Sequence, residues 1–301
     1  MNKKKQFTGS LCLLLATIIW GSAFVAQSVG MDHVGPFTFQ AIRCAMAFIG
    51  LLPVIFVADK IQRKQQSFIA LFMEKQLWKA AICCAVPLFA AVNLQQIGLV
   101  STDAGKSAFL TAMYIIFVPL IGILLKKKTS PMIPVSVVLA IVGLYFLSCF
   151  GTTSVQIGDI YLLGCALAFA VQIIFIDKYA SQVDPLRLNC LQAGLAAFGS
   201  FIMMLLTENP TLAGIQGSWL PMCYAGFLSM GIAFSLQIVG QKYLDPSVAS
   251  LIMSLESVFA VLCGWLLLNQ MLTVWEGIGC CLVFIAVILT QIPCKNTSKA
   301  K

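Results

Sequence analysis

Apolar runs long enough to cross a bilayer recur ten times along this chain, and no other feature restricts its fold as strongly. A transmembrane α-helix needs about 20 consecutive, mostly apolar residues. Only 10% of the residues are charged, against about 25% in soluble domains. The sequence therefore predicts an all-α integral membrane protein with ten transmembrane helices. The predicted spans are residues 8–29, 36–58, 78–100, 105–125, 131–150, 158–177, 185–206, 219–239, 246–268 and 274–292.

Lysine and arginine are concentrated in alternate connections between the runs. If the N-terminus is cytoplasmic, 17 of the 19 basic residues fall on the cytoplasmic side, where positive charge is normally in excess. The exceptions are Arg43, within a span, and Lys106, at the mouth of one. We therefore interpret the net charge of +8 as a topology signal and not as a nucleic-acid-binding surface. The prediction is a multi-pass protein in the lipid bilayer of the plasma (inner) membrane, with both termini cytoplasmic.

The two halves of the chain share short sequence features at the same spacing. A motif ending in glycine recurs, each time with an aspartate five residues later, and a second motif ending in proline recurs with a glycine at the same distance upstream. The matched positions are 93–98 with 235–240, Asp103 with Asp245, 34–36 with 183–185, and Gly9 with Gly158. These matches indicate an internal duplication.

Each half contains five spans, and because five is odd, the second half enters the membrane in the opposite orientation. We predict two inverted five-helix repeats, residues 1–150 and 151–294, followed by a cytoplasmic tail at 295–301. In transporters with inverted repeats, the substrate site tends to lie near the bilayer midplane between the repeats, and alternating access moves one part against the other. The alternative is an old duplication that is kept only for packing.

Four motifs occur in the order that a known group of transporters shows. They are Trp20-Gly21-Ser22-Ala23-Phe24 in the first span, Pro36 with Arg43 in the second, Ser107-Ala108-Phe109-Leu110-Thr111 with Tyr114 and Pro119 in the fourth, and Glu256-Ser257-Val258-Phe259-Ala260 in the ninth. Through these motifs nearly the whole chain resembles the drug/metabolite transporter (DMT) superfamily, specifically its EamA-type ten-helix members. Two positions depart from the pattern: Ser257 replaces the usual proline, and Asn269 stands where an acidic residue is common. The resemblance implies a secondary transporter, often an exporter of amino acids or other small metabolites.

Glu256 lies in the middle of the ninth span, where a carboxylate costs about 2.5 kcal/mol or more. Intramembrane acids are functional by default, so we expect Glu256 to line a central cavity and to exchange a proton or bind a substrate amine. The alternative is a structural anchor that is hydrogen-bonded to a neighbouring helix. In the repeat alignment the counterpart of Glu256 is Tyr114, and we expect the two side chains to form a polar pair between the repeats.

Arg43 is the eighth residue of the second span, about 10 Å below the outer surface at 1.5 Å per residue. A guanidinium at this depth needs an anion, carbonyl groups or water. The sequence leaves two roles open: Arg43 binds a substrate carboxylate or a protein acid, or it snorkels to the interface. Its repeat counterpart, Gln192, is polar but uncharged.

Other residues expected in the cavity are Trp20, Asn93, Gln96 and Gln237, with Gln27 and Gln172 as further polar positions within spans. Taken together, the amides suggest a hydrated cavity. For each amide taken singly, hydrogen bonding between helices is the alternative, worth roughly 0.6 kcal/mol on average. For Trp20 the alternative is plain packing in the helical core.

Signals for an enzyme, a cofactor or a metal are missing from the sequence. The single histidine, His33, rules out a histidine cluster, and the cysteine spacing fits no zinc site. Gly105-Lys106-Ser107 lacks the earlier glycine and the preceding strand of a phosphate-binding loop. We therefore expect a small-molecule transporter that uses a gradient instead of ATP, with protons as the first coupling ion to test. An exporter of drugs or amphipathic cations, and an ion or solute channel, remain alternatives; oligomeric state and substrate identity are left open.

Overall fold

The structure is a computed structural model that describes residues 3–63, 66–126, 131–148, 156–268 and 273–291, and the regular secondary structure within these ranges is all helical. The helices of the first half are α1 (Lys3–Gly30), α2 (Pro36–Ile61), α3 (Phe68–Phe72), α4 (Lys75–Leu99), α5 (Ala104–Thr111), α6 (Tyr114–Leu124) and α7 (Met132–Ser148). Those of the second half are α8 (Ile157–Tyr179), α9 (Pro185–Thr207), α10 (Leu212–Gly217), α11 (Trp219–Cys223), the π-helix η1 (Tyr224–Ala233), α12 (Phe234–Gln241), α13 (Pro246–Met253), α14 (Leu255–Leu268) and α15 (Val274–Gln291).

Eight helical stretches within the described residues are long and apolar enough to cross a membrane, and two shorter apolar helices cover Met132–Leu147 and Val274–Thr290. Three of the long stretches are composite: α5 with α6, α13 with α14, and α11 with η1 and α12. The prediction of an all-α membrane protein of about ten helices is therefore confirmed. The boundary predicted at 150/151, the tail at 295–301 and Asn269 lie outside the described residues.

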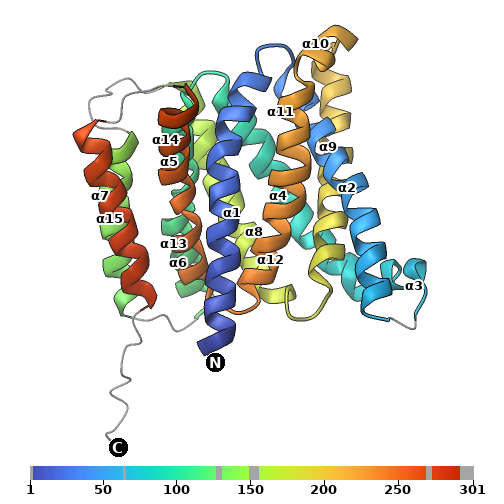
Figure 1. Cartoon of the computed structure of the whole chain (residues 1–301), viewed down its shortest axis with the longest axis horizontal. Helices are drawn as coiled ribbons and strands as arrows, with labels where there is room; N and C mark the ends of the chain where they lie inside the picture. Colours follow the sequence, from blue (N-terminus) through green and yellow to red (C-terminus); the bar gives the residue numbers. More distant parts are fainter. Residues whose placement is uncertain (1–2, 64–65, 127–130, 149–155, 269–272, 292–301) are drawn as a thin grey trace, which may run out of the picture.

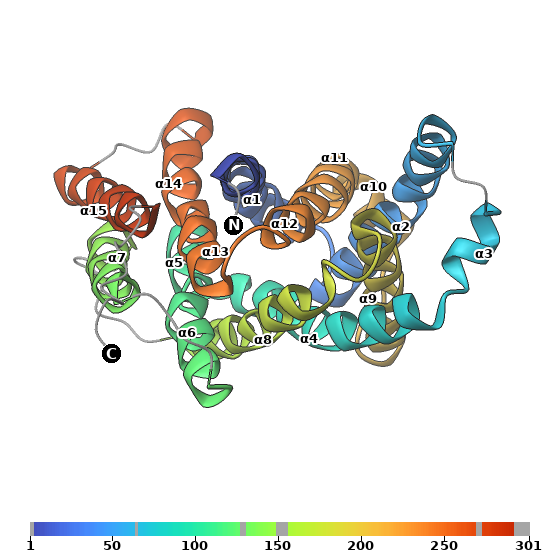
Figure 2. The same ribbon diagram turned by 90° about the horizontal axis from the view of Figure 1, so that it is seen from below.

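The helices surround the centre of the bundle from opposite sides. Figure 2 shows α1, α11 and α12 along one side and α4 and α8 along the other. The pair of α2 and α9 closes one end of this arrangement, and the pair of α7 and α15 lies at the opposite end. In Figure 1, α1 begins and α15 ends at the same end of the bundle. The chain therefore crosses the bundle an even number of times, as the ten predicted spans require.

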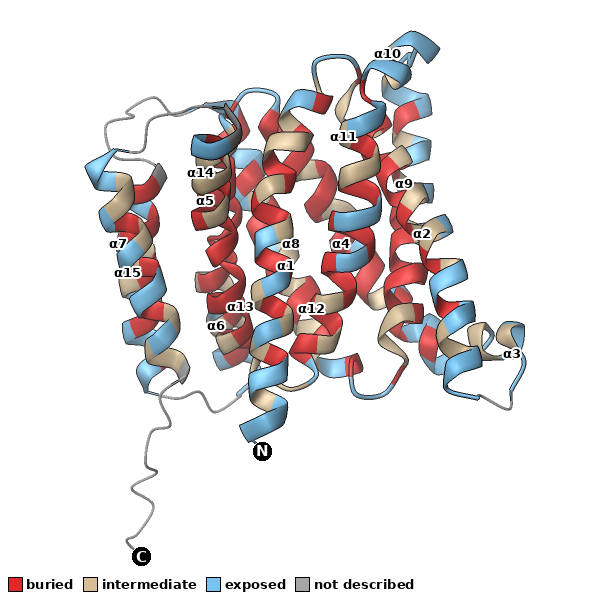
Figure 3. Cartoon of the chain, in the orientation of Figure 1, coloured by how far each residue is buried: buried red, intermediate tan, exposed pale blue. Residues whose placement is uncertain are grey.

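The outside of the bundle is largely apolar. Large side chains such as Ile49, Val86, Phe198 and Leu206 are between 64% and 74% exposed, and Figure 3 shows buried positions concentrated on interior helices such as α4, α8 and α13. Soluble monomers rarely expose large apolar patches, and here many large apolar side chains are exposed. In a bilayer the same side chains contact lipid tails, which are as apolar as leucine.

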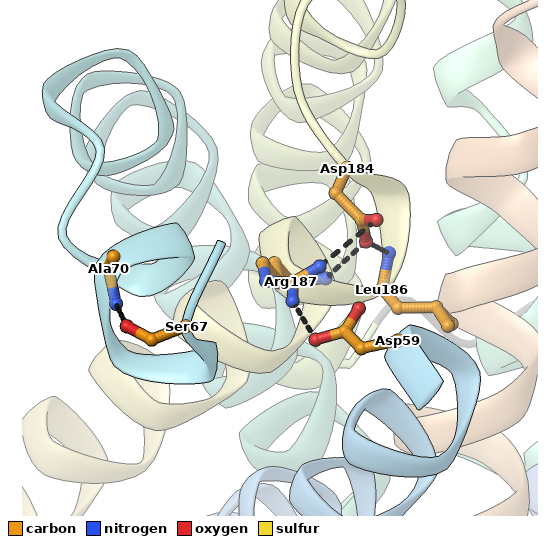
Figure 4. A network of polar contacts seen from close by, with 6 residues as sticks. All are labelled: Asp59, Ser67, Ala70, Asp184, Leu186 and Arg187. Atoms are coloured by element: carbon orange, nitrogen blue, oxygen red, sulfur yellow. Dashed lines mark hydrogen bonds and ion pairs between the residues drawn. The ribbon is translucent and has the colours of Figure 1, made fainter. Parts of the chain in front are cut away.

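Arg187 of α9 joins this helix to α2 at the end of the bundle that carries α3 (Figure 4). Its side chain is only 2% exposed and forms ion pairs with Asp59 at the end of α2 and with Asp184, the latter at 3.2 Å. Asp184 also caps α9, because its Oδ1 accepts a hydrogen bond from the backbone N–H of Leu186 at 3.1 Å. A buried guanidinium is thus neutralised by two carboxylates at one end of the α2–α9 pair.

Glu208, directly after α9, joins the same two helices at the opposite end. Its carboxylate accepts hydrogen bonds at 2.8 Å from the backbone N–H groups of Phe37 and Thr38 in the first turn of α2. The first N–H groups of a helix have no partner within the helix, and the helix dipole favours negative charge there. The α2–α9 pair is therefore held together at both ends.

Two pairs of glycines allow helices to approach closely. A Cβ atom on Gly9 of α1 would lie 2.9 Å from the carbonyl oxygen of Gly240 in α12. A Cβ atom on Gly158 of α8 would lie 2.6 Å from the carbonyl oxygen of Gly98 in α4. Small residues permit such contact between helix backbones in membranes. In the predicted repeat alignment, Gly9 matches Gly158 and Gly98 matches Gly240, so the two crossings are formed by equivalent positions.

We expect Gly158→Ala to destabilise the protein, because the added methyl group would lie too close to the Gly98 backbone and to Ser101 Oγ, 2.4 Å away. Overpacking of this kind costs about 1–3 kcal/mol. Gly122→Ala is the matched control, since a Cβ there would meet no heavy atom of the described residues within 4 Å and alanine favours a helix over glycine by about 1 kcal/mol. Thermal unfolding in detergent should separate the two variants. Equal melting temperatures would contradict the close crossing.

Candidate functional site

Two helix interruptions lie at matching places in the fourth and ninth spans. The first separates α5 from α6 at Ala112 and Met113, and the second separates α13 from α14 at Ser254. Both are tightened turns with i→i+3 hydrogen bonds, from Ile115 N to Ala112 O at 3.0 Å and from Ser257 N to Ser254 O at 3.2 Å. The chain is thus locally tightened near mid-span in both cases.

The interruption at Ser254 forms although Ser257 replaces the proline of the related motif. The hydroxyl groups of Ser250 and Ser254 donate to the carbonyl oxygens three residues earlier, Ser247 O at 2.9 Å and Leu251 O at 2.8 Å. Such hydrogen bonds to nearby backbone compete with helical bonding and often bend helices. The ninth span is therefore interrupted even without the proline, and serine side chains accompany the interruption.

Tyr114 and Glu256 meet immediately after these interruptions. Tyr114 is the first residue of α6, Glu256 is the second of α14, and the tyrosine hydroxyl donates to Glu256 Oε1 at 2.9 Å. The two side chains are 4% and 5% exposed. The expected polar pair is thus observed, and a carboxyl group is held in the interior of the bundle.

Arg43 of α2 is 2% exposed and is bonded to neutral groups. It donates to Gln27 Oε1 of α1 at 2.5 Å, to Ser229 Oγ of η1 at 2.9 Å, and to the carbonyl oxygen of Ala225 at 3.2 Å. The snorkelling alternative is therefore wrong, because the guanidinium is held inside the bundle by α1 and η1. π-Helical turns such as η1 occur frequently at functional sites.

A central cavity with a volume of about 30 Å³ brings these groups together. Small-molecule sites combine apolar walls with a few polar groups, and this cavity has that composition, although its volume in this conformation is well below the roughly 300–1,000 Å³ of an open ligand site. Among the described residues that line it, Arg43 and Glu256 are the charged ones. The lining residues are Trp20, Phe24, Gln27, Arg43, Gln95, Tyr114, Phe169, Ile173, Ser229, Phe234, Gln237, Met253 and Glu256.

Aromatic side chains form much of the cavity wall. The rings of Trp20 and Phe234 pack edge to face with centroids 5.0 Å apart, and the centroid of the Phe169 ring is 6.4 Å from that of Phe234. Trp20 therefore both packs in the core, as its alternative role proposed, and borders the cavity.

Asn93 and Gln96 were expected in the cavity but are not among its lining residues. Asn93 Nδ2 donates to Ser200 Oγ of α9 at 2.8 Å, and Gln96 Oε1 accepts from Gln40 Nε2 of α2 at 2.7 Å. Both side chains thus connect α4 to neighbouring helices, which is the packing role left open for them. The other predicted residues, Glu256, Tyr114, Arg43, Trp20 and Gln237, all line the cavity.

Several lining residues were missed by the sequence analysis, and the repeat alignment already contained a signal for two of them. Phe169 is the counterpart of Trp20, and Gln95 is the counterpart of Gln237. Ser229 had no such signal, because its place beside Arg43 depends on the π-helical geometry of η1.

Comparison with known proteins gives one family for the whole chain. The model of the EamA-like transporter family matches twice, over residues 7–149 and 156–292. An uncharacterized transporter of Archaeoglobus fulgidus is 30% identical over 96% of this chain and 87% of its own length. The uncharacterized inner membrane transporter YicL of Salmonella typhimurium is 24% identical over 97% of this chain and 98% of its own length.

A solved crystal structure has the same fold. It superposes with a TM-score of 0.77 and covers 94% of this chain and 96% of its own, at 16% sequence identity. This likeness bears on the arrangement of the helices and not on the substrate.

Proposed function

Because the chain belongs to the EamA-like transporter family, we propose that it is a secondary transporter that exports amino acids or other small metabolites across the inner membrane by alternating access. Both termini are cytoplasmic in this proposal, and the central cavity is the substrate site. The membership supports a membrane transporter rather than an enzyme. The substrate, the direction of transport and the mechanism are parts of the proposal.

The placement of Arg43 and Glu256 supports a substrate that carries both a carboxylate and an ammonium group. The two residues line the same cavity, and neither forms an ion pair with another charged residue of the described chain. Buried charges normally have a charged or metal partner. A zwitterion whose carboxylate meets Arg43 and whose ammonium meets Glu256 supplies the missing partners.

The proposed alternating access uses the two inverted repeats, 1–150 and 151–294. Several observations support the repeats: the family model matches once in each half, helix interruptions occur in the fourth and ninth spans, and equivalent glycines form two helix crossings. Helix packing is also exchanged between the halves, since α4 packs on α8 while the α11–η1–α12 stretch packs on α1. Inverted repeats recur in transporters whose site lies between the repeats.

Two alternatives make different predictions. Aromatic walls around Glu256 also suit an amphipathic cation, but a buried Arg43 repels one. A channel conducts without saturating at a single site. Counterflow of a labelled amino acid in proteoliposomes distinguishes the proposed transporter from both alternatives. Saturable exchange that unlabelled amino acids inhibit supports the proposal. Inhibition by amphipathic cations alone favours the drug exporter, and linear flux without counterflow favours the channel.

Proton coupling is expected to make substrate movement follow an imposed pH gradient. If Glu256 exchanges a proton during the cycle, uptake into proteoliposomes with an acidic lumen should exceed uptake without a gradient, because proton efflux then drives substrate entry. A protonophore should abolish the difference. Uptake that is the same with and without the gradient would remove proton coupling from the proposal and leave the transporter function in place.

A further inference from the structure

A relay of buried side-chain amides begins at Asn189 of α9. Its Nδ2 donates to the backbone carbonyl oxygens of Met230 at 3.0 Å and of Gly231 at 2.9 Å, and it lies 2.9 Å from Ser235 Oγ. A backbone carbonyl can only accept a hydrogen bond. The nitrogen of Asn189 must therefore face η1, which leaves its Oδ1 as an acceptor on the opposite side.

The relay continues from Asn189 to the cavity, and at every step an amide nitrogen donates to the amide oxygen of the residue before it in the relay. Gln192 Nε2 donates to Asn189 Oδ1 at 2.9 Å, Gln172 Nε2 donates to Gln192 Oε1 at 3.5 Å, and Gln237 Nε2 donates to Gln172 Oε1 at 3.3 Å. The two ends of an amide are assigned from their partners, and here the first partners are carbonyl groups. The last amide, Gln237, therefore keeps its nitrogen in the relay and has its oxygen free.

The free oxygen of Gln237 belongs to a residue that lines the cavity. Gln237 is 2% exposed, and its Oε1 is buried with no hydrogen-bond partner in the described structure. An unsatisfied buried polar atom costs about 1–3 kcal/mol. The relay thus places a hydrogen-bond acceptor, and not a donor, in the cavity wall.

Trp20 provides a donor in the same wall. Its Nε1–H is also buried without a partner among the described residues, and Trp20 is 9% exposed. Its ring packs on Phe234, which precedes Gln237 by three residues and shares a face of α12 with it. A donor and an acceptor, both without a partner among the described residues, therefore belong to residues that line the same cavity and are linked through Phe234.

We infer that the substrate carries a hydroxyl group that donates to Gln237 Oε1 and accepts from Trp20 Nε1–H. A hydroxyl has one donor and two acceptor lone pairs, so one group satisfies both atoms. This inference rests on the proposed function, because it describes the far end of a zwitterion held by Arg43 and Glu256. The cavity wall includes the rings of Phe169, Phe234 and Trp20, which can pack against an aromatic ring next to the hydroxyl once the cavity widens to admit the substrate.

The depth of Gln237 supports a long side chain. The end of α12 and the start of α13 lie at the same end of the bundle. Gln237 is four residues before the end of α12, and Glu256 is ten residues after the start of α13. At 1.5 Å per residue the two are separated by about 9 Å in depth. A para-hydroxylated aromatic side chain bridges such a distance, whereas the hydroxyl of a serine or threonine is too close to the ammonium group.

Tyrosine, phenylalanine and O-methyltyrosine are the probes that test this inference. All three share the zwitterion and the ring, but only tyrosine donates a hydrogen bond from the para position, and O-methyltyrosine still accepts one. In proteoliposome counterflow, we expect the half-saturation concentration for tyrosine to be about fivefold to a hundredfold lower than for the other two, from the cost of leaving Gln237 Oε1 unpaired.

Substitutions then test whether the preference for tyrosine over phenylalanine depends on Gln237. Gln237→Leu should reduce the ratio of tyrosine to phenylalanine to about twofold or less while phenylalanine is still carried. Gln192→Leu should also lower the ratio, because it cuts the relay that orients Gln237 without touching the cavity. Gln241→Leu is the control: it is on the same helix and equally buried, but it does not line the cavity, so the ratio should stay as in the wild type.

The possible failures can be told apart. Equal half-saturation for tyrosine and phenylalanine in the wild-type protein, as expected if a water molecule satisfies both wall atoms, would overturn this inference alone. A preference for tyrosine that survives Gln237→Leu would also overturn it. Absence of saturable counterflow with any zwitterion would overturn the proposed function and this inference with it.

Discussion

Glu256→Gln is expected to reduce transport of a zwitterionic substrate by about thirtyfold or more. Truncating one partner of a buried charge pair costs about 2–5 kcal/mol, and every 1.4 kcal/mol corresponds to a factor of ten. Glutamine has nearly the same shape, and its amide oxygen still accepts the hydrogen bond from Tyr114. The fold should therefore be kept while the negative charge is lost.

The measurement is initial counterflow at a substrate concentration well below half saturation, normalised to the amount of folded protein. Glu74→Gln is the matched control, since Glu74 is exposed outside the cavity and its side chain forms no capping hydrogen bond. Wild-type rates in Glu256→Gln would show that the carboxylate is a structural anchor, which is the alternative that the sequence left open.

Arg43→Gln is expected to remove the preference for a free carboxylate. The measurement compares the transport rates of an amino acid and its methyl ester, which keeps the ammonium group and the side chain but has no carboxylate. Hydrogen bonds to charged groups are worth about 1.5–3 kcal/mol, so the wild type should favour the free acid by about tenfold to a hundredfold. In the variant both compounds should be carried at similar rates, because glutamine has no positive charge to pair with the carboxylate.

Arg43 also connects α2 to α1 and η1, so its loss is expected to affect stability as well. The ratio of the two compounds separates these effects, because the amount of folded protein changes both rates equally. Arg187→Gln is the control: Arg187 is equally buried but lies in the ion-pair cluster between α2 and α9, outside the cavity. It should lower total uptake and leave the ratio unchanged. A preference for the free acid in Arg43→Gln would remove Arg43 from the substrate site.

Much of the fold could be predicted because crossing a membrane is a local property of the sequence. A run of about 20 apolar residues is sufficient to define a span, and the structure contains helices in all ten predicted runs. Composite spans were harder to predict. The interruption at Ser254 is accompanied by serine side chains that bond back to the helix, and the sequence analysis gave no signal for the π-helical geometry of η1.

The site was predicted in part. The predictions that succeeded and those that failed differ in whether the polar side chain faces the cavity or a neighbouring helix. Glu256 and Tyr114 could be paired through the repeat alignment, because equivalent positions of inverted repeats face each other across the pseudo-symmetric interface. Asn93 and Gln237 are both buried amides within spans, yet Gln237 lines the cavity while Asn93 bonds to Ser200 of α9. Their sequence context does not distinguish these two outcomes.

The sequence by itself determined that the chain inserts in the membrane as an all-helical bundle, because the free energy of burying each apolar run in lipid depends on that run alone. Only the tertiary structure decided which polar groups share the central cavity. Lipid and protein interior are equally apolar, so hydrophobicity does not fix the rotation of a helix about its axis. That rotation is set by close backbone crossings such as Gly9 with Gly240, and by hydrogen bonds between residues far apart in the chain, such as Tyr114 with Glu256.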